Sequence, residues 1–179
     1  MLSLIQKSHS EQVVLLSEKI FNCLRNIHRL KNNELSWLKN AALLHDIGWV
    51  NGRAKHHKRS RDMIIKCPYL PFTNKQRLII ALISRYHRGS LPKDTHKYFK
   101  DLSPASKNKI CWLAGILKLA DGFDRTHLAA INNIKCKVSK RKITLSLIPK
   151  QISPQDKVSG LKKRDILEKI SGRKIDILS

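Results

Sequence analysis

Several imidazole and carboxylate side chains fall on apolar helical stripes, where folding would bury them. At spacings of three or four residues, the stripes lead to His9, to His45 with the adjacent Asp46, to His87 and to Asp121. A single such histidine is usually a hydrogen-bonded core residue, but a buried carboxylate is costly unless it is paired or binds a metal. Four converging groups are hard to explain by packing alone. A mixed imidazole and carboxylate set predicts a divalent cation such as Mn, Fe or Zn rather than Ca or Mg.

These groups can meet only if helices carry them to a common point. Residues 10–130 show helical periodicity almost throughout, and the first helix has an amphipathic stripe of Val13, Leu16, Ile20, Leu24 and Ile27. A second helix is expected from Asn33 to near Gly48, and a short one over residues 60–65. Thr73 with Gln76, and Ser103 with Pro104, indicate two further helix starts.

The pattern changes after residue 132. Apolar residues alternate over 134–138 and 143–147 around a polar SKRK turn, which predicts a β-hairpin. A helix over 160–171, closed by Gly172, and a last strand around Ile175 and Ile177 follow. The sequence therefore predicts a mainly α protein with a helical domain (1–131) and a small α+β unit (132–179).

The inward groups lie in sequences that resemble a known superfamily. AALLHDIG at 41–48 resembles the core of HD-domain metal-dependent phosphohydrolases, whose motif is H…HD…D. The stretch from His9 to Val13 is similar to the opening H-x-x-x-V, and LADGF at 119–123 is similar to the segment with the closing aspartate. The resemblance implies an HD-type helical bundle.

A narrower resemblance covers about residues 9–177. HHKRS at 56–60, RYHRG at 85–89 and LAGILKLADGFDRTH at 113–127 are similar to the C-terminal HD-type domain of the exopolyphosphatase/guanosine pentaphosphatase (Ppx/GppA) family. Arg59 stands where family members commonly have a histidine. The actin-like domain that carries the polyphosphate-cleaving site in two-domain members is absent from these residues, so that activity is not carried over directly.

The resemblance also implies roles for individual residues. It implies that one metal is bound by His9, His45, Asp46 and Asp121. It also implies that Asp46, with His45 beside it, orients the attacking water. A second metal would be held by His56 and His87. His57 is an alternative to His56 and is otherwise a candidate phosphate ligand. The flanking cations expected to bind phosphate are Arg85, Arg88, Lys118 and Arg125.

Charge is the dominant bulk property. The chain has 36 Lys and Arg against 13 Asp and Glu, a formal net charge of +23, which favours polyanionic partners such as polyphosphate, nucleotides or nucleic acid. Compositional drift in an AT-rich genome would give the same excess.

Three functional hypotheses follow. The first is a metal-dependent phosphohydrolase acting on polyphosphate, a nucleotide or a (p)ppGpp-like compound. The second is a non-catalytic module that binds polyphosphate or nucleic acid. The third is the separately encoded half of a split phosphatase, docked on an actin-like polypeptide. A second copy of this chain, in a homodimer, is the alternative protein partner.

The remaining residues give expectations about compartment and packing. With no apolar run long enough to span a membrane, no secretory signal and no CxxC pair, the four cysteines are expected to be free thiols in a cytoplasmic protein without a membrane partner. Trp49 is expected in the core, and His127 at the surface.

Overall fold

The computed structural model describes residues 4–149 and 153–178. Its helical part contains α1 (Leu4–Cys23), α2 (Arg25–His28), α3 (Asn32–Leu44), a 3-10 helix η1 (Ile47–Asn51), α4 (His56–Lys66), α5 (Asn74–Arg85) and α6 (Pro104–Gly122). After these come β1 (Ile131–Val138), β2 (Lys142–Pro149), α7 (Pro154–Lys162), α8 (Asp165–Ser171) and β3 (Lys174–Leu178). The predicted class, a helical bundle with a small α+β unit, is confirmed.

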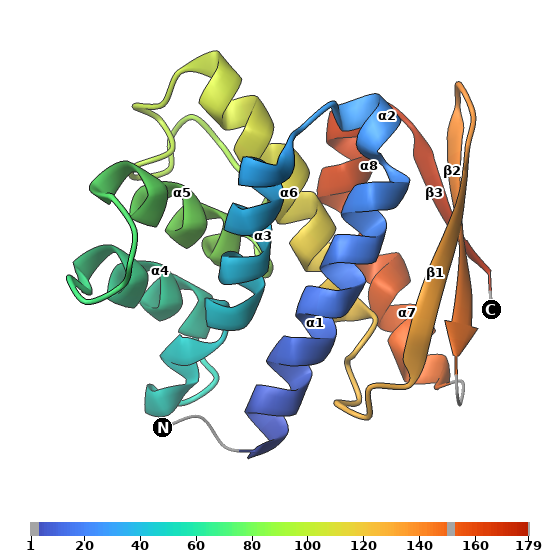
Figure 1. The fold of residues 1–179 in the computed structure, drawn as a ribbon, viewed down its shortest axis with the longest axis horizontal. Helices are drawn as coiled ribbons and strands as arrows, with labels where there is room; N and C mark the ends of the chain where they lie inside the picture. The colour runs from blue at the N-terminus through green and yellow to red at the C-terminus, as the bar shows by residue number, and fades with distance from the viewer. Residues whose placement is uncertain (1–3, 150–152, 179) are drawn as a thin grey trace.

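The central helix of the bundle is α6, which packs against α1, α3, α5, α7 and α8 (Figure 1). Its C-terminal two thirds are almost entirely buried. The stripe predicted for the first helix faces this core, since Val13, Leu16 and Ile20 are fully buried. Burial of such side chains stabilises the fold by roughly 1.5–3 kcal/mol each.

A three-stranded sheet of order β1-β2-β3 lies at one side of the bundle (Figure 1). The predicted hairpin is present as the antiparallel pair β1 and β2, and β3 adds to β2 in parallel. Alternate residues of β2, namely Ile143, Leu145 and Leu147, are buried. The division of the chain into units 1–131 and 132–179 stays a prediction.

Three helix boundaries differ from expectation. The helix expected to run to near Gly48 ends at Leu44, and the separate 3-10 helix η1 follows. The short helix begins at His56 rather than near residue 60, and the helix predicted over 160–171 is two helices, α7 and α8. The chain turns at Lys163 and Arg164 so that Leu167 can pack closely against Gly115 of α6. Periodicity does not show this turn, because it depends on a contact with a distant helix.

The prediction of four free thiols is wrong for one pair. Cys23, at the end of α1, forms a disulfide with Cys136 of β1, with their Cα atoms 5.8 Å apart, whereas Cys67 and Cys111 are free. The partners are 113 residues apart in sequence, so no local motif reveals them. The cysteines therefore no longer support the expected cytoplasmic location.

Capping contacts set the ends of the helices that lead to the site. The Thr73 hydroxyl accepts a hydrogen bond from the Gln76 backbone N–H at the start of α5, and Ser103 does the same for Ser106 at the start of α6. Both helix starts were predicted.

Within the described residues, no helix is both long and apolar enough to cross a bilayer.

Candidate metal centre

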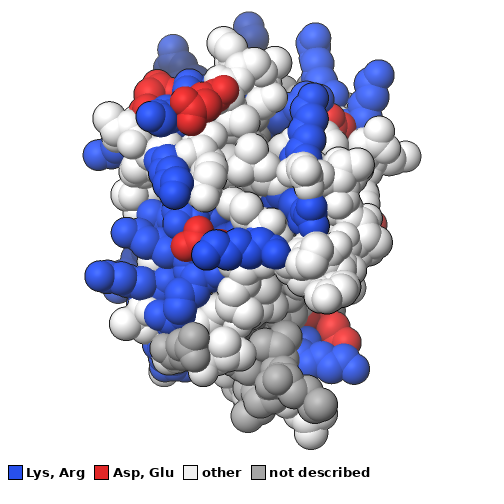
Figure 2. All heavy atoms as spheres, turned by 90° about the vertical axis from the view of Figure 1, so that its left-hand side faces the viewer, with Lys and Arg blue, Asp and Glu red and all other residues white. Residues whose placement is uncertain are grey.

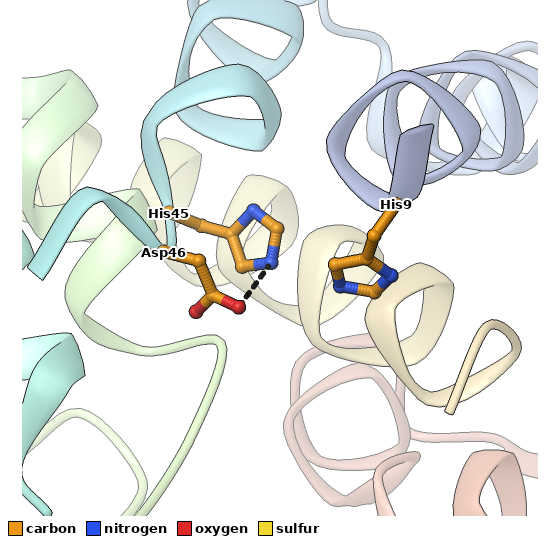
Figure 3. A group of neighbouring side chains, drawn as sticks. All are labelled: His9, His45 and Asp46. Carbon is orange, nitrogen blue, oxygen red and sulfur yellow. Dashed lines mark ion pairs between the residues drawn. The ribbon is translucent and has the colours of Figure 1, made fainter. Parts of the chain in front are cut away.

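Side chains from five helical elements meet at one end of the bundle. His9 lies on α1, His45 and Asp46 follow α3 directly, and Asp121 is in the last turn of α6. His45 and Asp46 face His9 across the gap between their helices (Figure 3). His56 in the first turn of α4 and His87 after α5 complete the group. All six side chains are buried.

The first cluster is formed by His9, His45 and Asp46, each of which offers one ligand atom within 4.8 Å of the others. Asp121 lies beside it, with Oδ1 at 3.3 Å from His9 Nε2 and 3.9 Å from His45 Nε2. His45 Nδ1 is 2.6 Å from the Ala42 carbonyl oxygen, to which it must donate. This tautomer leaves a lone pair on His45 Nε2, an atom with no hydrogen-bond partner within the described ranges.

The second cluster consists of His56 and His87 around the other oxygen of Asp46. His56 Nε2 is 3.1 Å and His87 Nε2 is 3.5 Å from Asp46 Oδ1. The Nδ1 atom of each ring donates to a backbone carbonyl, of Arg53 in one case and of Ser84 in the other. The two Nε2 atoms, 3.1 Å apart, therefore present lone pairs to each other, an arrangement that a cation between them would stabilise.

The ionisation of the carboxylates and of His87 fits ligand roles. Burial alone would raise the pKa of Asp46, but neighbouring His45, His56 and His87 hold it below its ordinary value. Burial likewise opposes ionisation of Asp121, yet Lys163 and His9 keep its pKa well below the usual range. Burial lowers the pKa of His87 to about 3. Both acids are therefore carboxylates at neutral pH, and His87 is a neutral imidazole, as metal ligation requires.

His9 is held differently. Burial would lower its pKa, but hydrogen bonds to Asp121 and Asp124 outweigh burial and raise the pKa to about 9. Its Nδ1 lies 2.7 Å from Asp124 Oδ2, and the other oxygen of Asp124 accepts from the Ala129 backbone N–H. Asp124 therefore fixes the ring so that Nε2 points at Asp121.

The Gly48 backbone allows α4 to bring His56 to the site. A Cβ at this position would lie 2.4 Å from the His56 carbonyl oxygen, too close for any other residue without movement. The Gly48 N–H donates to the Ser60 hydroxyl, and its carbonyl accepts from the Arg59 guanidinium. Arg59 thus holds this turn together and lies outside both clusters.

A pocket of about 210 Å³ opens over both clusters. Its walls come from α1, η1, α4, α7 and the segments that follow α5 and α6. The residues that line it are His9, Asp46, Trp49, His56, His87, Arg88, Asp121, Arg125, His127, Ser159 and Lys163.

Comparison with known proteins places this arrangement in a family. Residues 4–163 match the model of the family described as Ppx/GppA phosphatase, domain III. The chain belongs to this family. The match includes both clusters and all of α7, so the family domain contains the whole pocket. No curated protein shows significant similarity to the sequence.

The cations expected to bind phosphate in this Ppx/GppA domain fall into two groups. Arg88 and Arg125 are exposed and line the pocket. Arg85, Lys118 and His57 are not among the lining residues.

Two of these three residues have structural partners. Buried Arg85 donates to the Arg88 carbonyl. The Lys118 ammonium donates to Asp165 at 2.8 Å and to the Gly89 carbonyl at 3.3 Å. These hydrogen bonds hold the segment after α5 and the helix α8 against the bundle.

His57, the alternative to His56, lies outside both candidate metal clusters. Burial, with the charge of nearby Arg85, lowers its pKa to about 4. The ring is therefore neutral, which leaves it without the charge that a phosphate contact would use.

Several pocket residues were missed or misjudged from sequence. His127, expected at the surface, stacks on His9 with ring centroids 4.0 Å apart, and Trp49, expected in the core, is half-buried in the pocket wall. Asp124 lies three residues after Asp121, and this helical spacing is a local signal that the two carboxylates lie near each other. Nothing in the local sequence marks Lys163, because its position depends on how α7 packs against α6.

Proposed function

We propose that this Ppx/GppA-family domain is a metal-dependent phosphohydrolase of the HD type, acting on a polyanionic phosphate such as polyphosphate, a nucleotide or a (p)ppGpp-like compound. The observation that carries the proposal is the position of Asp46 between two clusters, in which His45, His56 and His87 each donate Nδ1–H to a backbone carbonyl and direct Nε2 to the site. Buried lone pairs and carboxylates of this kind fit a divalent transition metal better than a hydrogen-bonded core.

The residues take distinct roles in this proposal. His9, His45, Asp46 and Asp121 would hold one ion, and His9 would lose its Nε2 proton when the ion binds. His56 and His87 with Asp46 would hold a second. A bound divalent ion lowers the pKa of a coordinated water toward ~7 and so makes hydroxide available at neutral pH. Asp46, whose two oxygens face different clusters, can accept a hydrogen bond from a water between them and orient it.

The pocket wall supports the phosphate end of the proposal. Arg88 follows α5 and Arg125 follows α6, and both guanidinium groups lie in the lining of the same pocket as the clusters. Planar guanidinium groups pair with two phosphoryl oxygens at once. Trp49 and His127 also line the pocket, with their ring centroids 6.1 Å apart.

Metal dependence and phosphate release together test this proposal. Protein stripped with a chelator is titrated with Mn²⁺, and phosphate release from nucleotides and polyphosphate is measured for wild type, His45→Ala and Asp46→Asn. We expect release only with metal, and a loss of at least about 100-fold in both variants. Asp101→Asn, an exposed carboxylate outside the site, is the matched control. Release that persists in the chelated protein or in Asp46→Asn would refute the proposal.

One surface feature favours polyanion binding as a second candidate function. Residues 53–100 contain 13 Lys and Arg against two Asp. On the face of the molecule that carries α4 and α5, Lys and Arg outnumber Asp and Glu (Figure 2). A binding module would retain polyphosphate or nucleic acid in Asp46→Asn, with an affinity that falls steeply with salt and without turnover.

A further inference from the structure

Lys163 reaches the metal centre from the C-terminal part of the chain. It is the residue directly after α7, its side chain is 22% exposed, and its ammonium forms an ion pair with Asp121 Oδ2. It also lines the pocket above both clusters. Its charge is therefore close to the carboxylate expected to bind metal.

Two contacts hold α7 in place and so bring Lys163 to Asp121. Asp156 in the first turn of α7 accepts hydrogen bonds from the Thr126 backbone N–H and hydroxyl, both at 2.9 Å. Near the other end, Gly160 packs on Phe123, and a Cβ there would lie 2.3 Å from that ring. These two anchors hold α7 beside the end of α6, where the two helices are in contact (Figure 1).

The two oxygens of Asp121 face different partners. Oδ1 is directed to the Nε2 atoms of His9 and His45, whereas Oδ2 is held by Lys163. A divalent ion bound at Oδ1 would lie only a few ångströms from the ammonium, and like charges at that separation repel strongly in a buried site. Lysine and metal therefore compete for one carboxylate.

We propose that Lys163 is an exchangeable counter-ion of the metal centre. Resting on the function proposed above, the inference is that Lys163 neutralises Asp121 in the metal-free protein. When a divalent ion binds, Lys163 is released into the pocket and contacts a substrate phosphoryl oxygen together with Arg88 and Arg125. A flexible stem with a compact three-donor head suits such a movement better than a rigid guanidinium would.

The first test compares metal and phosphate binding in Lys163→Met and wild type by calorimetry. We expect Mn²⁺ to bind on the order of tenfold more tightly to Lys163→Met, because a competing charge is gone. Inorganic phosphate should bind the Mn²⁺-loaded variant about tenfold more weakly, because one of three cations is lost. Lys162→Met, which removes an exposed neighbouring charge, should leave both affinities within about twofold of wild type.

The outcomes separate this inference from the proposed function. Equal or weaker Mn²⁺ binding by Lys163→Met, with normal binding by wild type, overturns the counter-ion role and leaves the hydrolase proposal standing. Unchanged phosphate affinity overturns the release into the pocket. Wild-type protein that binds no Mn²⁺ refutes both.

A second test needs no variant and so does not depend on one that folds. Wild-type protein is treated with an amine-acylating reagent with and without Mn²⁺, and the modification of Lys163 is measured by mass spectrometry relative to Lys162. We expect Mn²⁺ to increase acylation of Lys163 several-fold, because its amine leaves the ion pair with Asp121. Acylation that is unchanged or reduced by Mn²⁺ contradicts the exchange.

Discussion

At the scale of single residues, hydrogen bonds to backbone carbonyls decide what the histidines can do. His45, His56 and His87 each commit Nδ1 to a carbonyl oxygen, so each presents Nε2 to the site. His9 differs, because its Nδ1–H donates a hydrogen bond to the carboxylate of Asp124. Such outer partners fix ring orientation and raise ligand basicity. Asp124 is thus a positioning residue for the centre.

Asp124→Asn tests this role. The amide oxygen still accepts from the Ala129 N–H, but the amide NH₂ now donates to His9 Nδ1. Because Nδ1 then accepts a hydrogen bond, the imidazole proton lies on Nε2, where it blocks metal ligation. We expect Mn²⁺ affinity to fall by about 10–100-fold with an unchanged circular dichroism spectrum. Calorimetric titration against the Asp101→Asn control measures this. An affinity within twofold of wild type would show that Asp124 does not orient His9.

At the scale of elements, a part-buried ion pair between Glu34 and Lys109 ties the start of α3 to α6. One oxygen of Glu34 accepts from the Lys31 backbone N–H at 2.9 Å, and the other binds Lys109 of α6 at 2.6 Å. Burial would raise the pKa of Glu34, but Lys109 and the backbone donors outweigh it and lower the pKa from its ordinary value of 4.5.

The lowered pKa of Glu34 gives a pH-dependent prediction. Because the folded-state pKa is below the unfolded one, the stabilisation is complete above about pH 5 and is lost as the pH falls through 4.5 toward the folded value. Glu34→Gln should cost about 1 kcal/mol at pH 7 and nearly nothing at pH 3. Urea unfolding at both pH values measures the difference, and an equal cost at the two would contradict the role of the charge.

At the scale of the whole molecule, the disulfide joins the first helix to the sheet. Cys23 and Cys136 close a loop that contains every residue of both metal clusters except His9. A cross-link over so long a segment restricts the unfolded chain and so stabilises the fold.

Cys23→Ser should lower the free energy of unfolding by about 2–5 kcal/mol under oxidising conditions. Cys67→Ser, which alters a free half-buried thiol, serves as the control and should change little. Urea unfolding gives the energies, and thiol titration of the denatured wild type should find two free thiols rather than four. Four titratable thiols in protein isolated without reductant would contradict the cross-link.

Local patterning indicated four of the side chains that meet at the site. His9, His45, His87 and Asp121 continue apolar stripes at helical spacing, and all four are buried. The helix starts at Thr73 and Ser103 were equally local, since capping needs only residues within one turn.

Only the tertiary structure decided how those side chains pair. The sharing of Asp46 by two clusters, the arrival of Lys163, the placement of His127 in the pocket and the Cys23–Cys136 bond all join segments distant in sequence. Such contacts arise from packing of whole helices, for which the spacing of residues along one helix carries no signal. Arg85 and Lys118 show the same limit, because packing gives each of these two predicted phosphate ligands a hydrogen-bond partner within the protein.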